Sequence, residues 1–255
     1  MTHAHRFHYF PPPSSFHFDS TLFTLHTDHQ RSGGLTLTTM ATASLAGLEA
    51  DKECITIVGD YDLTLRVIEY ERVEDADANG DTQMTRAPSK LYVCTVQRDL
   101  LARSSDFFRT LLRDEKFGEA QQTVIDLHQD GLASGIIIWL VLLHDTVTTD
   151  TYQLEIQDVW YMLLAAHKYG LNPKTDRAKA WFSEWYSAYR KHTDLDYEEC
   201  QMLLLPCFTF DHAVGFQQAT EFLVYHGCRH ITEKRPADFP FDHLRLDQSV
   251  IRKRP

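Results

Sequence analysis

β-Branched and apolar residues gather in short segments at the start of the patterned part of the chain, and this predicts β-strands. The segments 54–58 and 62–70 are separated by a Gly-Asp-Tyr turn, and 91–96 forms a third such segment. The intervening residues are polar and acidic, so we interpret 71–90 as a loop of about twenty residues. A further short strand is predicted at 121–127.

After the third strand, apolar residues recur at the spacing of a helix that begins near Arg98. One face of this helix carries Leu101, Ser105, Phe108 and Leu112, spaced four, three and four residues apart. The polar residues 114–116 end the helix and leave Phe117, a large apolar ring, in a polar loop.

Helices are predicted over most of the second half of the chain. The segment 130–145 reads as a buried helix, although periodicity alone leaves a buried strand open. The segment 154–171 is a clearer helix, because Gly170 suits a left-handed cap and Pro173 prevents continuation. Three more helices are predicted at 174–192, 194–205 and 211–227, the last with Asp211 as N-cap and Gly227 as stop.

This order of elements predicts an α+β fold, a small mixed sheet covered by helices, followed by an all-helical C-terminal extension. Residues 1–50, rich in Pro, Ser, Thr and His, are interpreted as a disordered or weakly ordered arm. The sheet domain is expected at 51–172 and the helical region, with an irregular tail, at 173–255. Met40 is a candidate for the true start of translation, a hypothesis that a native N-terminal peptide from upstream of Met40 would refute.

Composition narrows the classes of partner and compartment. The formal net charge of -11 repels phosphate backbones, so nucleic acid is not expected as a partner. No segment reaches the roughly 18 consecutive apolar residues of a membrane span, so no membrane association is expected. The five cysteines form no Cys-x-x-Cys pair, which favours a reduced intracellular compartment, cytoplasm or nucleus.

Two patterns resemble metal sites. Part of the acidic segment matches the spacing of a calcium-binding loop, but the position that should hold a bidentate Glu is Arg86, whose charge would repel the ion. The matching residues are Asp75, Asp77, Asn79, Gly80 and Asp81. We favour an acidic hairpin connection over a calcium site. The histidines of the arm and of the segment 226–230 lack a four-ligand zinc spacing, so no metal is predicted.

Motifs for catalysis are not found. The sequence has no Gly-x-Ser-x-Gly elbow and no glycine-rich phosphate loop, so no catalytic residue and no cofactor is assigned. The aromatic stripe of Trp181, Trp185 and Tyr189 is interpreted as core, with a ligand box as the less favoured reading.

With these elements in order, the chain resembles the BTB/POZ domain. The resemblance rests on DLTLRV, then LYVCTVQRDLLARSSDFFRTLL, then EKFGEAQQTVIDLHQD, and it continues through residues 160–186 and 203–231 as in a large group of fungal BTB proteins. It covers about residues 55–246. Two polar positions depart from the family pattern, since Gln97 replaces the usual His and Arg98 the usual Lys.

The resemblance implies a module for protein association, and no enzymatic activity. BTB domains form homodimers and heteromers, and many dock to a cullin scaffold of a ubiquitin ligase, so a homodimer and a cullin are the implied partners. In cullin-binding members a hydrophobic-x-Glu motif follows the helix, and Phe117-Gly118-Glu119 matches it. Two interpretations of Phe117 stay open: an exposed anchor for a partner, or a ring that folds back over the core helices.

Two other functions compete with the adaptor hypothesis. A BTB-derived structural or transcription-associated scaffold would share the fold without the ubiquitin link. An enzyme with an unrecognised site is the third reading, and a deep pocket with convergent polar groups would favour it. No kelch, zinc-finger or MATH-like segment accompanies the domain, so substrate recruitment would fall to the helical extension, the segment 71–90 or the arm.

Overall fold

The computed structural model describes most of the chain beyond the predicted arm. The described ranges are 52–76, 82–113, 118–129, 131–193, 195–227, 230–237, 239, 241–247 and 250. All of them belong to one structural unit, Ala41–Pro255. The predicted arm at 1–50 lies outside the described residues.

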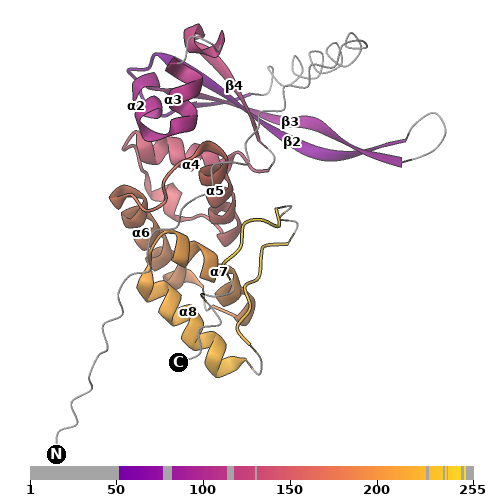
Figure 1. The fold of residues 1–255 in the computed structure, drawn as a ribbon, viewed down its shortest axis with the longest axis vertical. Coiled ribbons are helices and arrows are strands. Elements are labelled where there is room, and N and C mark those ends of the chain that lie inside the picture. The colour runs from indigo at the N-terminus through magenta and orange to yellow at the C-terminus, as the bar shows by residue number, and fades with distance from the viewer. Residues whose placement is uncertain are drawn as a thin grey trace, which may run out of the picture. The chain divides into compact units, whose positions relative to one another are not determined.

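A four-stranded mixed sheet forms the first half of this unit. Its strands are β1 (Glu53–Thr56), β2 (Leu63–Ala76), β3 (Thr82–Val96) and β4 (Val124–Gln129), in the order β1-β3-β2-β4. β2 and β3 are antiparallel, whereas β1 lies parallel to β3 and β4 parallel to β2. Helices follow, as Figure 1 shows, so the predicted mixed α+β fold is confirmed.

The prediction of a loop at 71–90 is wrong. β2 continues to Ala76 and β3 begins at Thr82, with those two residues paired, and a bulge near Tyr70 shifts the register. Backbone pairing requires no apolar side chain, so a polar hairpin escapes a search for apolar alternation. The hairpin connection that we favoured over a calcium site is therefore flanked by paired strands, and the calcium-loop positions 77–81 lie outside the described residues.

Seven α-helices and two short 3₁₀ helices occur in the described part of the chain. They are α2 (Arg98–Ser104), α3 (Asp106–Arg113), η2 (Gly118–Gln121), α4 (Ser134–Leu143), η3 (Thr149–Tyr152), α5 (Ile156–Tyr169), α6 (Asp176–His192), α7 (Tyr197–Thr209) and α8 (Ala213–His226). α4 confirms the predicted buried helix. α5 ends at Gly170 in the left-handed conformation, with φ 61°, as predicted.

The single helix predicted from Arg98 is divided into two. Ser105 adopts an extended conformation between α2 and α3. Its buried hydroxyl donates to the carbonyl of Tyr169 and accepts from the backbone N–H of Phe108, 3.2 Å away, which caps the start of α3. The predicted face still packs inward, because its four residues are all buried.

The N-cap of α8 also differs from the prediction. Asp211 lies before the cap in a left-handed conformation, with φ 57°. The cap is His212, whose Nδ1 accepts from the backbone N–H of Gly215 at 3.1 Å. Asp211 instead forms an ion pair with Lys179, at 2.6 Å.

One continuous apolar core joins the sheet to the helices. The aromatic stripe of α6 is part of it, since Trp181, Phe182 and Trp185 are buried, which confirms the core interpretation. The rings of Phe182 and Phe210 stack with centroids 4.6 Å apart. Aromatic contacts therefore hold α6 against the end of α7. α5 packs on both α4 and α7.

His144 joins the end of α4 to the start of α2 through two hydrogen bonds. Its Nδ1–H donates to the carbonyl of Leu140 at 2.7 Å, and its Nε2 accepts from the N–H of Gln97 at 2.9 Å. A second proton on Nε2 would remove that acceptor. Burial lowers the pKa of His144, and also lowers those of His167 and His212.

We expect the free energy of unfolding to decrease as the pH falls through about 6.5. Below that pH the histidines of the unfolded chain bind protons, whereas the folded histidines, whose pKa values are lowered, stay neutral. The stability that is present above this pH is therefore progressively lost. Urea unfolding at about pH 7.5 and pH 5.5 measures the effect. His144→Gln should show a shallower pH dependence than the wild type; an unchanged slope would contradict the assignment.

Candidate protein-interaction surface

The turn after α3 contains the residues that the sequence singled out. Phe117 lies outside the described residues. Gly118 opens η2 and is exposed, and Glu119 is half-buried, with its carbonyl accepting from the N–H of Gln122 at 3.1 Å. Two of the three predicted residues are therefore placed side by side on an accessible turn.

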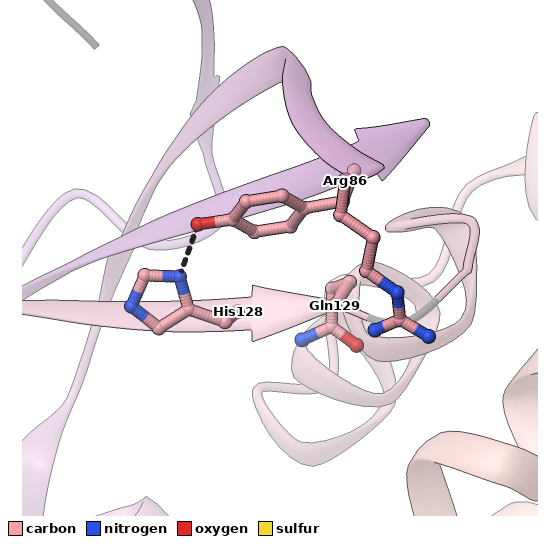
Figure 2. Close-up of a pocket in the computed structure, with 4 residues that line it drawn as sticks. Arg86, His128 and Gln129 are labelled. Carbon is pink, nitrogen blue, oxygen red and sulfur yellow. Dashed lines mark hydrogen bonds between the residues drawn. The ribbon is translucent and has the colours of Figure 1, made fainter. Parts of the chain in front are cut away.

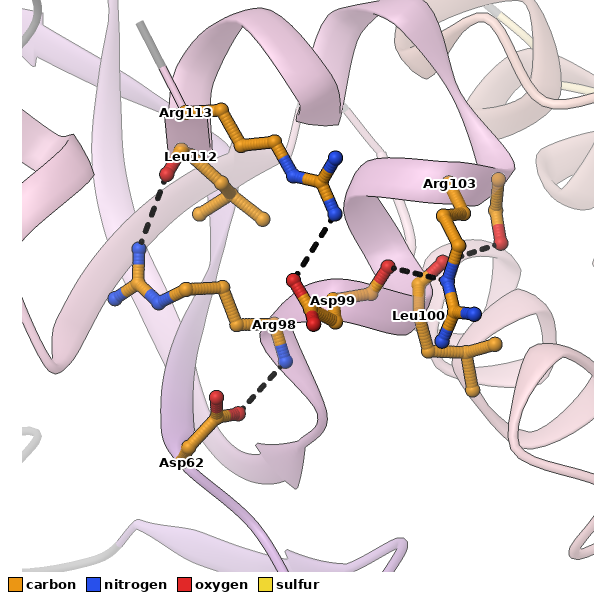
Figure 3. A network of polar contacts seen from close by, with 8 residues as sticks. Asp62, Arg98, Asp99, Leu100, Arg103, Leu112 and Arg113 are labelled. Carbon is orange, nitrogen blue, oxygen red and sulfur yellow. Dashed lines mark hydrogen bonds and ion pairs between the residues drawn. The ribbon is translucent and has the colours of Figure 1, made fainter. Parts of the chain in front are cut away.

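Arg98 fixes this turn from the start of α2. Its guanidinium donates to the carbonyl of Ala120 at 3.0 Å, to that of Gln122, and to that of Leu112 at the longer distance of 3.5 Å. Its own backbone N–H donates to Asp62 at 2.7 Å (Figure 3). One side chain thus ties the end of α3 to the last part of the following turn.

The planar, multiply donating guanidinium explains why this position suits an arginine. A lysine ammonium has one nitrogen, whereas the guanidinium reaches carbonyls in two directions through separate N–H groups. The sequence revealed Arg98 only as a departure from the family pattern. Its role depends on carbonyls 14 to 24 residues away, which no local pattern encodes.

Paired charges and one partly exposed aromatic ring lie on α2 and α3, the two helices that precede this turn. Arg113 contacts the Asp99 carboxylate at 3.0 Å, and Arg109 pairs with Asp106. The Phe107 side chain, 38% exposed, lies edge-on to Phe108 and Tyr169, with centroids 5.4 and 5.2 Å apart. We define the α2–α3 surface by its accessible residues, which are Asp99, Arg103, Asp106, Phe107, Arg109, Arg113, Gly118 and Glu119.

This arrangement suits contact with another protein. A partly exposed ring that buried aromatic neighbours hold in place costs little side-chain entropy on binding. At protein interfaces, ions of both signs set orientation and exclude wrong partners more than they add affinity. Each exposed ion pair adds little to the stability of the isolated chain.

No group of three or more His, Cys, Asp or Glu side chains gathers within the described ranges as a metal site would require. Burial raises the pKa of Cys94 to about 12 and that of Cys200 to about 11, and it also raises the pKa of Cys207. These three thiols therefore stay protonated near neutral pH.

A small pocket at the end of β4 was not foreseen from the sequence. Tyr70, Arg86, His128 and Gln129 line it, and its volume is about 210 Å³ (Figure 2). The hydroxyl of Tyr70 is hydrogen-bonded to Nδ1 of His128 at 2.7 Å. Three strands contribute these residues, and the sequence interpretation had assigned Arg86 to a loop, so their meeting could not be predicted.

No protein-family model matches the chain, and no curated protein matches its sequence. Among the described helices, none combines the length and apolar character needed to cross a membrane.

Proposed function

We propose that this chain is a BTB/POZ-type protein-interaction module that self-associates and recruits other proteins inside the cell. The order of elements supports this: an antiparallel strand pair, a pair of short helices, a strand, and then packed helices. The apolar residues that carry the sequence resemblance, Leu101, Phe108 and Leu112, are buried together in one core. The fold is thus built around the same positions as the resemblance.

We further propose that the module acts as a substrate adaptor by docking to a cullin scaffold. The observation that carries this proposal is the turn at Gly118–Gln121, which Arg98 holds directly after the position of Phe117. A fixed turn that follows a surface of mixed charge with one partly exposed ring is suited to present an apolar anchor residue, here Phe117, to a partner. Under the alternative of a scaffold without a ubiquitin link, the same turn would serve a different partner.

Binding to the purified N-terminal domain of a cullin tests the adaptor proposal. We expect Phe117→Ala to weaken binding at least about tenfold, the size of effect at which an anchor residue is recognised. The measurement is a titration by calorimetry, with circular dichroism showing that the variant stays folded.

The control is Tyr225→Ala, which removes an aromatic ring that is 83% exposed on α8, away from the turn. It should bind the cullin domain as tightly as the wild type. If the wild type does not bind, or if both variants lose binding equally, the adaptor proposal fails and the scaffold alternative gains.

A further inference from the structure

One edge of β2 continues past the strand that covers it. β4 pairs with β2 only as far as Glu69 and Gln129, whereas β2 runs on to Ala76, paired with β3 on its other side. Figure 1 shows β2 and β3 continuing as a two-stranded ribbon beyond β4. Within the described residues, no strand pairs with the outer edge of β2 from Tyr70 to Ala76, which we call the open edge.

The open edge has the properties of a template for strand addition. It spans seven residues, about the length of an ordinary strand, and contains neither Pro nor Gly. Unpaired N–H and C=O groups along such an edge accept a further strand, and the charged residues of the edge and the bulge at Glu69/Tyr70 restrict which strands can pair. The one proline of the hairpin, Pro88, lies in β3 opposite Tyr70.

The pocket lies at the foot of the open edge, where β4 ends. Its lining includes the guanidinium of Arg86, the hydroxyl of Tyr70, an imidazole and an amide. The hydroxyl of Tyr70 is hydrogen-bonded to His128, and Figure 2 shows the side chain of Arg86 beside that of Gln129. Lys168 adds a second cation nearby, because its Nζ donates to the carbonyl of His128. These groups suit a carboxylate.

Strand direction connects the two features. β2 runs from the pocket toward Ala76, so a strand added antiparallel to it would end at the pocket. We propose that the open edge binds the C-terminal segment of a partner protein as an antiparallel strand, with the terminal carboxylate in the pocket of Tyr70, Arg86, His128 and Gln129. Main-chain hydrogen bonds would supply affinity and the carboxylate would fix the register.

Charge selects among the partners that this edge could accept. The open edge, residues 70–76, contains three acidic residues and one basic residue, so its sequence is acidic. A second copy of the same edge would bring like charges together, which disfavours pairing of two hairpins. The favoured occupant is therefore a peptide with Lys and Arg upstream of its free carboxylate.

The test uses the full chain and synthetic heptapeptides in fluorescence polarisation. The probe is fluorescein-Lys-Val-Arg-Val-Lys-Val-Val with a free carboxylate, beside an amidated twin and a twin with Glu at the basic positions. We expect the free acid to bind about tenfold more tightly than the amide, as for one charge-assisted contact, and the acidic twin to bind weakest. Arg86→Gln should abolish the preference for the free acid, whereas Arg190→Gln, a matched change at an exposed arginine of α6, should not.

Backbone pairing is tested separately with N-methylated probes. In an added strand, alternate N–H groups face β2 and the others face solvent, so methylation of one alternate set should abolish binding and methylation of the other should not. Equal binding of acid and amide, equal effects of the two methylated sets, or no saturable binding of the probe would overturn the proposal. This inference goes beyond the proposed function, because it uses neither Phe117 nor the α2–α3 surface; failure of either binding experiment leaves the other intact.

Discussion

Trp160→Ala is expected to lower the free energy of unfolding by about 3–5 kcal/mol, the range for deleting a large buried aromatic side chain. Trp160 is fully buried in α5, and its ring lies 5.3 Å, centroid to centroid, from that of Phe239. Its Nε1–H donates to the carbonyl of Met202 in α7 at 3.0 Å. The substitution therefore opens a cavity and leaves a carbonyl without its donor, both at the junction of the two helices.

Urea unfolding followed by circular dichroism measures this loss. The control is again Tyr225→Ala, whose ring is exposed and should change stability by less than about 0.5 kcal/mol. Similar losses for the two variants would show that α5 and α7 do not pack as described. Because α5 also contacts α4, the sheet domain and the helical region should unfold in one transition.

Gly135→Ala is expected to destabilise the protein by about 1–3 kcal/mol, the range for overpacking a close-packed core. Gly135 lies in α4, where a Cβ atom would meet the backbone of α5: the carbonyl oxygen of Tyr161 at 2.4 Å and the N of Met162 at 2.9 Å. Backbone atoms cannot rotate away as a side chain would. The two helices would have to separate.

Intrinsic helix propensity alone predicts that Gly135→Ala raises the free energy of unfolding, so the direction of the measured change distinguishes the two effects. Alanine in a helix interior is favoured over glycine by about 1 kcal/mol, so a freely exposed Gly135 would give a gain. Gly59→Ala is the matched control, because a Cβ there meets nothing within 4 Å. A stabilised Gly135→Ala variant would contradict the close approach of α4 and α5.

The elements that the residue pattern predicted correctly are those whose structure depends on residues close together in the sequence. α5 was predicted with its end, because a left-handed Gly followed by Pro three residues later specifies a stop. The polar strands of the hairpin were missed, since their pairing depends on backbone partners. The break at Ser105 was also missed, because the carbonyl that holds its hydroxyl belongs to Tyr169, 64 residues away.

Some residues of the candidate surfaces were predicted from a local motif, and others are brought together only by the fold. Gly118 and Glu119 were predicted from a short contiguous motif, and both lie on an accessible turn. The side chain that fixes this turn, Arg98, acts on distant carbonyls and was noted only as an unusual residue. The pocket joins residues from β2, β3 and β4, so its existence follows from the strand order and not from any segment of sequence.

The central claim is that this chain associates with proteins, beginning with a second copy of itself. Light scattering of the full chain after size-exclusion chromatography tests this most directly, over a rising series of concentrations. The account predicts a mass that approaches twice the 29.5 kDa of one chain as concentration increases. A mass that stays at 29.5 kDa at every concentration would contradict it.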